Sequence, residues 1–292
     1  MGAPMNLCDI REIKALLARH GFRFSKAMGQ NFLTAAWVPE QIAEKAGLTR
    51  ADGVLEIGPG IGCLTERLSR AAGKVVAVEL DRALFPILAE TLRACDNVEV
   101  VPGDIMKTDI HALLDEKLAD MPVSVCANLP YQITTPVLAR LIDTGRFQAI
   151  TVMLQREVAR RICASAGTSD YGAFSLYAQY HMVPVMLFDV PPECFIPQPK
   201  VTSTVLRMTK RAVPPVSLQN EAVFWKTIKA AFAMRRKTLQ NALTPAFGQA
   251  IPREALALLI SACGFDPRIR GEALDLQGFA DIANAIATRL SS

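Results

Sequence analysis

The sequence predicts an α/β protein in which a parallel sheet with helices on both faces precedes a small all-helical domain. Short apolar segments alternate with segments of helical length between residues 54 and 154. A glycine-rich loop, Gly58-Pro-Gly-Ile-Gly62, follows the first apolar segment, and the pattern beyond Pro214-Pro215 is helical. Alternation of this kind builds parallel sheets that helices cover on both faces.

The first fifty residues precede this alternation. Helices are expected over residues 9–20 and 37–46, the second ended by Gly47, with an ordered loop over residues 21–34. Glycine commonly ends a helix because it adopts the left-handed backbone conformation without a side-chain penalty.

The sheet is expected to contain seven strands. These strands cover residues 54–57, 74–79, 98–101, 123–127, 149–154, 186–190 and 203–208. The helices around them cover residues 64–71, 82–93, 110–118, 135–142 and 156–164. Because a parallel sheet binds ligands at the carboxyl ends of its strands, the polar residues at those ends are the functional candidates.

The rest of the chain predicts a structured loop and a separate helical domain. Residues 191–199 contain four prolines and are expected to form the loop. Helices are expected over residues 221–243, 253–263 and 274–290. The chain is therefore expected to divide into a sheet domain, residues 1–212, and a helical domain, residues 213–292.

Composition excludes several classes of protein. The chain has 292 residues, of which 51% are apolar and 21% charged, which is typical of a globular protein with a large core. It contains no apolar run of membrane-spanning length and no apolar N-terminal stretch of signal-peptide length. These observations favour a cytoplasmic protein without membrane contact.

The cysteines and histidines predict free thiols and no metal centre. None of the 7 cysteines forms a CxxC pair, and the 3 histidines lie far apart in the sequence. Closely spaced pairs of these residues are typical of zinc sites. Free thiols in a reducing compartment are therefore expected.

The glycine-rich loop predicts a nucleotide-like cofactor. Gly58, Gly60 and Gly62 allow a tight turn and bring amides at a helix N-terminus close to a ligand. Glu79 ends the next strand, where its carboxylate can accept from both ribose hydroxyls. A dinucleotide-binding fold uses an acid at a similar distance, although its loop is GxGxxG. Asp104, after the third strand, can accept from an adenine amino group, so the two acids favour S-adenosylmethionine.

The segment Asn128-Leu-Pro-Tyr131 follows the fourth strand and predicts the target pocket. The amine of adenine is a poor nucleophile because its lone pair is delocalised into the ring. Two acceptors, Asn128 Oδ1 and the carbonyl of Leu129 or Pro130, would favour a pyramidal nitrogen. Tyr131 would stack on one face of the base and Phe195 on the other. Methyl transfer to the exocyclic nitrogen of a nucleobase is therefore expected, driven by positioning and electrostatics.

A basic cluster in the C-terminal third predicts contact with RNA backbone. Residues 201–250 hold eight Lys or Arg and one acid, and the net charge of the chain is +4. Clustered cations neutralise phosphates. The residues expected to bind RNA are Lys226, Lys229, Arg235, Arg236 and Lys237. Structural alternatives remain open: a solvated helix face for this cluster, a strand cap for Asn128, and core positions for Tyr131 and Phe195.

Six motifs together resemble the ribosomal RNA adenine N6-dimethyltransferases, above all the bacterial small-subunit (kasugamycin-sensitivity) branch. The motifs are Gly29-Gln-Asn-Phe-Leu33, Glu56-Ile-Gly-Pro-Gly-Ile-Gly62, Val78-Glu-Leu-Asp81, Gly103-Asp104, Asn128-Leu-Pro-Tyr131 and Phe195-Ile-Pro-Gln-Pro-Lys-Val201. The resemblance implies a Rossmann-like, seven-stranded, S-adenosylmethionine-dependent methyltransferase domain followed by a small helical rRNA-binding domain. It also implies that the N-terminal segment, residues 1–47, covers the cofactor.

The resemblance also implies an activity and a set of site residues. The expected reaction transfers methyl groups from S-adenosyl-L-methionine to N6 of two adjacent adenines in the 3′-terminal hairpin of 16S rRNA, giving N6,N6-dimethyladenosine. The expected partner is 16S rRNA within the assembling 30S subunit, and the enzyme is expected to be a cytoplasmic monomer without a metal ion. The residues expected to hold the cofactor are Gln30, Asn31, Leu33, Gly58, Gly60, Glu79, Leu80, Asp104, Ile105 and Asn128.

Two rival functions share much of this pattern. The large-subunit rRNA methylases that confer macrolide resistance carry similar cofactor and target motifs. A binding protein on the same fold, such as a ribosome-assembly checkpoint or a mitochondrial transcription factor, would need no chemistry. The presence of Asn128 and Glu79 favours an enzyme, and the loop that begins at Phe195 favours the small-subunit branch.

Overall fold

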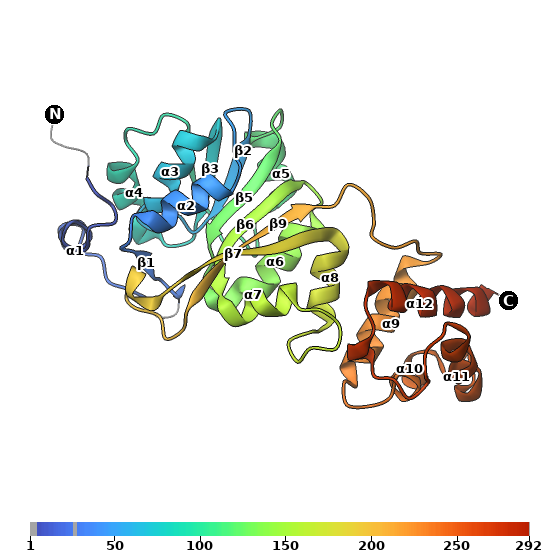
Figure 1. Cartoon of the computed structure of the whole chain (residues 1–292). Helices are drawn as coiled ribbons and strands as arrows, with labels where there is room; N and C mark the ends of the chain where they lie inside the picture. The colour runs from blue at the N-terminus through green and yellow to red at the C-terminus, as the bar shows by residue number, and fades with distance from the viewer. Residues whose placement is uncertain (1–4, 26–27, 292) are drawn as a thin grey trace. The chain divides into compact units, whose positions relative to one another are not determined.

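The computed structural model describes residues 5–25 and 28–291 (Figure 1). Contacts divide the chain into two compact units, residues 1–159 with 184–210 and residues 160–183 with 211–292. The predicted division at residue 212 differs from this one, because residues 160–183 group with the C-terminal helices. Among the described residues, no helix has the length and apolarity needed to cross a bilayer.

The first unit contains a seven-stranded sheet with the strand order β4-β3-β2-β5-β6-β9-β7. Its strands are β2 (Gly53–Ile57), β3 (Lys74–Glu79), β4 (Val98–Pro102), β5 (Val123–Asn128), β6 (Phe147–Gln155), β7 (Met182–Val190) and β9 (Ser203–Lys210). Strands β2 to β6 are parallel, and β9 runs antiparallel to β6. The predicted strands are therefore confirmed. The chain reverses its direction of progress across the sheet between β2 and β5, which is where open α/β sheets bind ligands.

Strands β2, β3 and β5 form the centre of this sheet. Almost all of their residues are buried, and Val is frequent among them, as is typical of central parallel strands. Two acidic side chains are buried with them, Glu56 in β2 and Glu79 at the end of β3. A carboxyl group in such a position is costly unless a partner or a ligand compensates for its lost hydration.

The helices of this part of the chain follow the predicted segments. They are α1 (Ile10–Arg19), α2 (Trp37–Lys45), α3 (Cys63–Ala71), α4 (Phe85–Thr91), α5 (Ile110–Lys117), α6 (Thr134–Asp143) and α7 (Arg156–Cys163). Asp9 caps α1, because its Oδ1 accepts from the backbone N of Arg11 at 2.7 Å and of Glu12 at 3.3 Å. Gly47, with a φ of 65°, ends α2 as predicted.

A short ladder attaches the N-terminal segment to the rest of the first unit. Strand β1 (Phe32–Leu33) pairs antiparallel with β8 (Phe195–Ile196), and Leu33 lies opposite Phe195. The sequence predicts loops for both regions. Local patterns do not reveal a pairing between segments so distant in the chain, and this ladder holds the N-terminal segment over the sheet.

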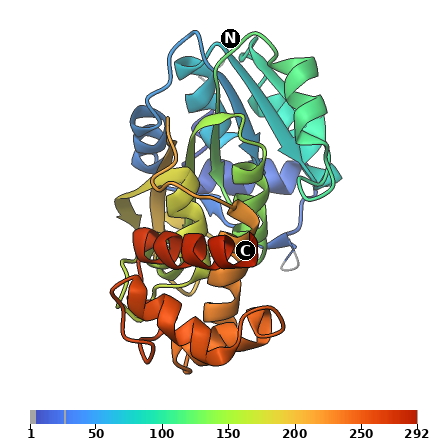
Figure 2. The same ribbon diagram turned by 90° about the vertical axis from the view of Figure 1, so that its right-hand side faces the viewer.

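The second unit contains five helices among its described residues, α8 (Ala173–His181), α9 (Glu221–Ala233), α10 (Leu239–Phe247), α11 (Arg253–Ala262) and α12 (Leu276–Ser291). Figure 2 shows α9 to α12 in orange to red. The predicted helices over residues 253–263 and 274–290 are confirmed as α11 and α12. Helix α8, which the hydrophobic pattern does not predict, contributes Leu176 to the core of this unit. The buried Tyr171 hydroxyl donates to the Leu274 carbonyl at 2.9 Å.

The prediction of a single helix over residues 221–243 is wrong. The structure breaks it between Ala233 and Leu239, and the segment between holds Arg235, Arg236 and Lys237. Lys and Arg are good helix formers, so the local pattern gives no signal for this break. The turn allows the apolar faces of α9 and α10 to join one core.

Candidate active site

A cavity of about 220 Å³ lies at the carboxyl ends of β2, β3, β4 and β5. Five stretches of the chain line most of it: residues 28–33, 56–61, 78–80, 103–105 and 128–133. One water molecule occupies about 30 Å³ in the liquid, so the cavity has room for an organic ligand. It lies at the reversal of strand order, where the sequence predicts the site.

The glycine-rich loop has the backbone geometry that the sequence predicts. Gly58, Gly60 and Gly62 have φ angles of 68°, 61° and 91°, in the left-handed region. A Cβ at Gly60 would lie 3.2 Å from the Phe32 ring, and a Cβ at Gly62 would lie 2.9 Å from Leu92 Cδ2. The loop therefore has no slack for larger side chains, and its backbone borders the cavity directly.

Glu79 lines the cavity from the end of β3 and is 6% exposed. Its Oε1 accepts from the Asp81 backbone N at 2.7 Å. Gln30 Nε2 donates to Asp81 Oδ2 at 2.6 Å, while Gln30 Oε1 accepts from the Ser25 backbone N at 2.8 Å. Burial raises the pKa of Glu79. Gln30 thus ties the N-terminal segment to the turn that holds the Glu79 carboxylate.

The other end of the cavity suits a flat base. Leu80, Asp104 and Ile105, which the sequence predicts to hold the cofactor, line this end. Leu80 is 55% exposed although it is apolar, while Ile105 is buried, so both can offer apolar surface to a ring. Asp104 Oδ1 caps a turn by accepting from the Met106 backbone N at 2.9 Å, and Lys107 Nζ lies 3.8 Å from Asp104 Oδ2.

Asn128 connects the sheet to the N-terminal segment. Its Nδ2 donates to the Asn31 backbone O at 3.1 Å, and both residues line the cavity. Because this hydrogen bond fixes the amide, Nδ2 faces Asn31 and Oδ1 remains as an acceptor. The predicted role of Asn128 requires its side-chain oxygen to face the cavity as an acceptor. The backbone carbonyl of Asn31 orients the amide in this way.

The sequence leaves open whether the carbonyl of Leu129 or that of Pro130 is the second acceptor, and the hydrogen bonds of the structure distinguish them. The Pro130 carbonyl accepts from the Ile133 backbone N at 3.2 Å and from Thr134 Oγ1 at 3.2 Å. A carbonyl oxygen has two lone pairs, and these bonds occupy both. The Leu129 carbonyl is therefore the better second acceptor for a target amine.

Tyr131 is half-buried at the cavity, and its ring is held in place. Its hydroxyl lies 2.7 Å from Ser203 Oγ, which is buried in β9. Burial raises the pKa of Tyr131, so the hydroxyl stays protonated near neutral pH. The ring can thus offer a fixed face to a base.

Phe195 and Leu33 form the ladder pair of β1 and β8 but differ in position. Leu33 lines the cavity, as predicted, whereas Phe195 is 3% exposed, belongs to the hydrophobic core and is not part of the cavity wall. Stacking on a target base would require the Phe195 ring to leave that core. The structure therefore matches the core alternative for this residue.

Glu56 is a candidate that the sequence reasoning missed. It lines the cavity, is 1% exposed, and its Oε2 has no hydrogen-bond partner among the described residues. Burial raises its pKa to about 8. The available signal was an ionisable residue inside the apolar strand that leads directly into the glycine-rich loop.

The cavity wall fits S-adenosyl-L-methionine. Glu56, Glu79 and Asp104 place carboxyl groups around the cavity, and this cofactor carries a sulfonium and an ammonium group. The unpartnered Oε2 of Glu56 is a buried polar atom that such a cation would satisfy. No group of three or more metal-ligating side chains occurs within residues 5–25 and 28–291.

The predicted RNA-binding residues all belong to the second unit and are exposed. Lys226 Nζ lies 4.6 Å from the centre of the Phe247 ring. Arg235 Nε pairs with Glu272 Oε2 at 2.6 Å, and its Nη2 donates to the Ser169 carbonyl at 2.7 Å. These bonds make Arg235 part of the framework of the unit, which the sequence could not reveal.

Comparisons with known proteins agree with the geometry of the cavity. A family model described as ribosomal RNA adenine dimethylase matches residues 21–283. The chain is 45% identical over 276 residues to "Ribosomal RNA small subunit methyltransferase A" of Geobacillus thermodenitrificans, which covers 94% of each chain. It is 46% identical over 285 residues to the protein of the same name from Streptococcus pneumoniae, covering 97% of this chain and 98% of the relative.

Two solved structures are similar in fold. A dimethyladenosine transferase from Plasmodium falciparum superposes with a TM-score of 0.73 at 23% identity, over 86% of this chain and 95% of that one. The 23S rRNA methyltransferase ErmE superposes with a TM-score of 0.68 at 24% identity, over 89% of this chain and 100% of that one. Both likenesses agree with the predicted Rossmann-like methyltransferase fold.

Replacing Glu79 with Ala should weaken binding of S-adenosyl-L-methionine. The expected loss is about 1–3 kcal/mol, the usual value for a hydrogen bond to a charged group. Isothermal titration with the cofactor measures it, and Glu99→Ala on β4 is a matched control, because Glu99 does not line the cavity. An unchanged cofactor affinity for the Glu79 variant would remove Glu79 from the site.

The ligand-free protein should lose stability between about pH 4.5 and about pH 8 because of Glu56. Its folded-state pKa is raised from 4.5 to about 8, so the folded state binds more protons than the unfolded state in that window. The contribution of Glu56 is complete below the lower value and is lost as the pH rises through the upper one. Thermal unfolding of wild type and Glu56→Gln across this range measures the difference, and parallel pH profiles would contradict it.

Proposed function

Because the chain belongs to the ribosomal RNA adenine dimethylase family, we propose that it dimethylates N6 of two adjacent adenines in the 3′-terminal hairpin of 16S rRNA. The methyl donor of this family is S-adenosyl-L-methionine. The choice of the small-subunit RNA rests on the curated relatives, which carry that subunit in their names and match nearly the whole chain. The observation that carries the chemistry is the oriented amide of Asn128, in the same cavity as three carboxyl groups.

The cofactor end of the cavity binds by charge and shape. We assign Glu79 to the ribose hydroxyls, Asp104 with Leu80 and Ile105 to the adenine, and Glu56 to the cationic end. When bound there, S-adenosyl-L-methionine supplies a methyl group on a positively charged sulfur. Carboxyl groups within a poorly hydrated cavity favour this cation more strongly than water would.

The target end of the cavity orients the nucleophile. Asn128 Oδ1 and the Leu129 carbonyl accept the two hydrogens of the adenine amine, which favours a pyramidal nitrogen with its lone pair directed at the methyl group. Tyr131 supports the base by stacking. After attack, the nitrogen loses one proton to water, and the same amine can react a second time. An adenine within a helix cannot reach this cavity, so the target is unpaired or flipped out of its stack.

The same proposal includes the substrate particle, the cell compartment and the RNA contacts of the enzyme. The substrate is 16S rRNA within the assembling 30S subunit, and the enzyme acts as a cytoplasmic monomer. Exposed cations of the second unit, above all Arg236, Lys237 and Lys229, contact the rRNA backbone. We favour these residues over Arg235, because the Arg235 guanidinium already pairs with Glu272 within the protein.

A methylation assay tests this function directly. Small subunits and large subunits from cells that lack the enzyme are incubated with methyl-labelled S-adenosyl-L-methionine and the purified protein. We expect label in N6,N6-dimethyladenosine of 16S rRNA and none in 23S rRNA. Label in the large subunit would indicate the macrolide-resistance activity, and no transfer to either subunit would indicate a binding protein.

Asn128→Ala should reduce turnover far more than cofactor affinity. The lost acceptor acts on the target amine, and removal of one preorganised transition-state contact typically costs 10²–10³-fold in rate. Single-turnover methylation measures the rate, and cofactor titration measures affinity. Equal losses in both would assign Asn128 to cofactor binding alone.

The double variant Arg236→Ala/Lys237→Ala should weaken subunit binding and flatten its salt dependence. Each lost phosphate contact lowers the slope of log affinity against log salt by about 0.7–0.9. Filter binding at several salt concentrations measures this slope. Arg235→Ala is the matched control, since it should lower the stability of the second unit more than it changes the slope. A wild-type slope for the double variant would exclude these residues from the RNA contact.

A further inference from the structure

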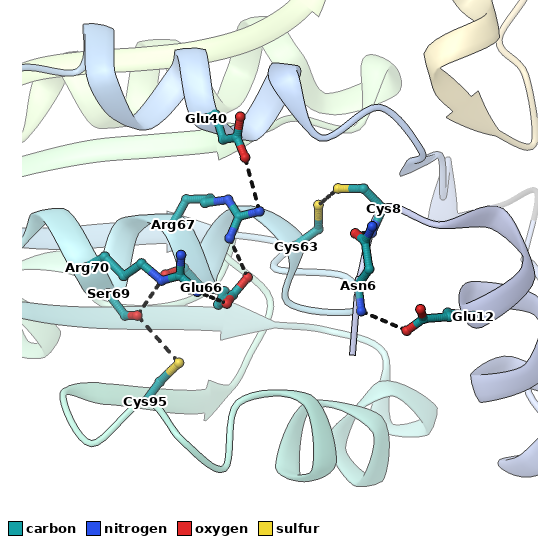
Figure 3. A network of polar contacts seen from close by, with 10 residues as sticks. All are labelled: Asn6, Cys8, Glu12, Glu40, Cys63, Glu66, Arg67, Ser69, Arg70 and Cys95. Carbon is teal, nitrogen blue, oxygen red and sulfur yellow. Dashed lines mark hydrogen bonds and ion pairs between the residues drawn. The ribbon is translucent and has the colours of Figure 1, made fainter. Parts of the chain in front are cut away.

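Two thiols meet behind the glycine-rich loop. Cys8 Sγ lies 2.8 Å from Cys63 Sγ, and both residues are buried. Figure 3 shows the two side chains pointing toward each other. Cys63 is the first residue of α3, directly after Gly62, and it also lines the cofactor cavity. Neither sulfur takes part in the methyl-transfer chemistry proposed above.

Both cysteines are held firmly in place. Cys8 belongs to a turn in which its backbone N donates to Asn6 Oδ1 at 3.1 Å, and the Asn6 backbone N donates to Glu12 Oε2 at 2.7 Å (Figure 3). Helix α1 follows this turn and buries its apolar face in the core of the first unit. The sulfur atoms therefore face each other because of the fold, and a disulfide of about 2.05 Å requires them to approach by less than one ångström.

The surroundings favour one thiolate in the pair. The hydrogen bond from Cys63 lowers the pKa of Cys8, and the nearby Arg67 guanidinium acts in the same direction. Burial and the carboxylates of Glu40 and Glu66 oppose this. Arg67 is fixed by ion pairs to both acids, at 3.3 Å to Glu40 and 2.8 Å to Glu66. A thiolate is the nucleophilic form of cysteine, so Cys8 is the attacking sulfur.

We propose that Cys8 and Cys63 form a peroxide-sensitive dithiol, whose oxidation to a disulfide weakens cofactor binding. The Cys8 thiolate attacks one oxygen of the hydroperoxide, the O–O bond breaks, and hydroxide leaves, which gives a sulfenic acid. The Cys63 sulfur then attacks the Cys8 sulfur, the S–O bond breaks, and the oxygen leaves as water with the Cys63 proton. Two thiols and one peroxide become one disulfide and two waters, and an added dithiol reverses the step by exchange.

The effect on the cofactor follows from the position of Cys63. Closing the bond displaces the start of α3, and with it the Gly62 end of the loop that borders the cavity. The loop is closely packed, because a Cβ at Gly60 would lie 3.2 Å from the Phe32 ring and a Cβ at Gly62 would lie 2.9 Å from Leu92 Cδ2. A shifted loop would no longer fit the bound cofactor closely, and the affinity for the cofactor would fall. In turn, bound cofactor holds the loop in its ligand-bound position and should slow the closing of the disulfide.

The experiment treats the reduced protein with hydrogen peroxide and then alkylates the remaining thiols. Digestion and mass spectrometry should find residues 8 and 63 joined, two of the seven thiols lost, and both recovered with dithiothreitol. The oxidised protein should bind S-adenosyl-L-methionine several-fold more weakly by titration. Its thermal midpoint should rise by roughly 5–10 °C, because the new bond constrains the unfolded chain.

Two variants separate this pair from the other thiols. Cys8→Ser should lose both the cross-link and the effect of peroxide on cofactor binding, whereas Cys95→Ser, which alters a thiol bonded to Ser69 at 3.4 Å, should keep both. If Cys8→Ser fails to fold, the alkylation pattern of the peroxide-treated wild type still shows whether Cys8 and Cys63 are joined. Seven alkylated thiols after peroxide, or a Cys8–Cys63 disulfide with unchanged cofactor affinity, would overturn the proposal. Because methyl transfer to RNA is not measured, this outcome is independent of the proposed rRNA substrate.

Discussion

The hydrogen bond from Asn128 Nδ2 to the Asn31 carbonyl links the two parts of the chain that make the site. Asn128 ends a central strand, and Asn31 lies in the N-terminal segment that the β1–β8 ladder holds over the cavity. An amide can present either its oxygen or its nitrogen to a ligand. Because the nitrogen donates to Asn31, the proposed reaction uses the oxygen as the acceptor for the target amine. That role would depend on a loop far from the strand in sequence.

Electrostatics supply the second constraint. Glu56 and Glu79 are buried in the wall of one cavity, and burial raises the pKa of both. Without a ligand, this arrangement costs stability, since two carboxyl groups are removed from water. In the proposed function, the positively charged methyl donor offsets part of that cost when it binds.

The second unit illustrates how charge and structure compete for the same residues. The sequence groups Arg235, Arg236 and Lys237 as one basic cluster, but Arg235 is bonded to Glu272 and Ser169. The cluster also interrupts the helix expected over residues 221–243. The turn allows α9 and α10 to pack in one core, and Arg236 and Lys237 are exposed on it.

The sequence by itself determined the seven strands of the large sheet, their ends and the glycine-rich loop, because each depends on local chemistry. Short apolar segments that alternate with segments of helical length are typical of buried parallel strands, and glycine adopts the left-handed angles of Gly58, Gly60 and Gly62 without strain. Only the tertiary structure decided which groups meet. The Asn31–Asn128 bond, the core position of Phe195, the unpartnered Glu56 Oε2 and the Cys8–Cys63 contact all join segments distant in the chain or depend on burial. Such contacts follow from the packing of the whole fold, which local residue patterns do not encode.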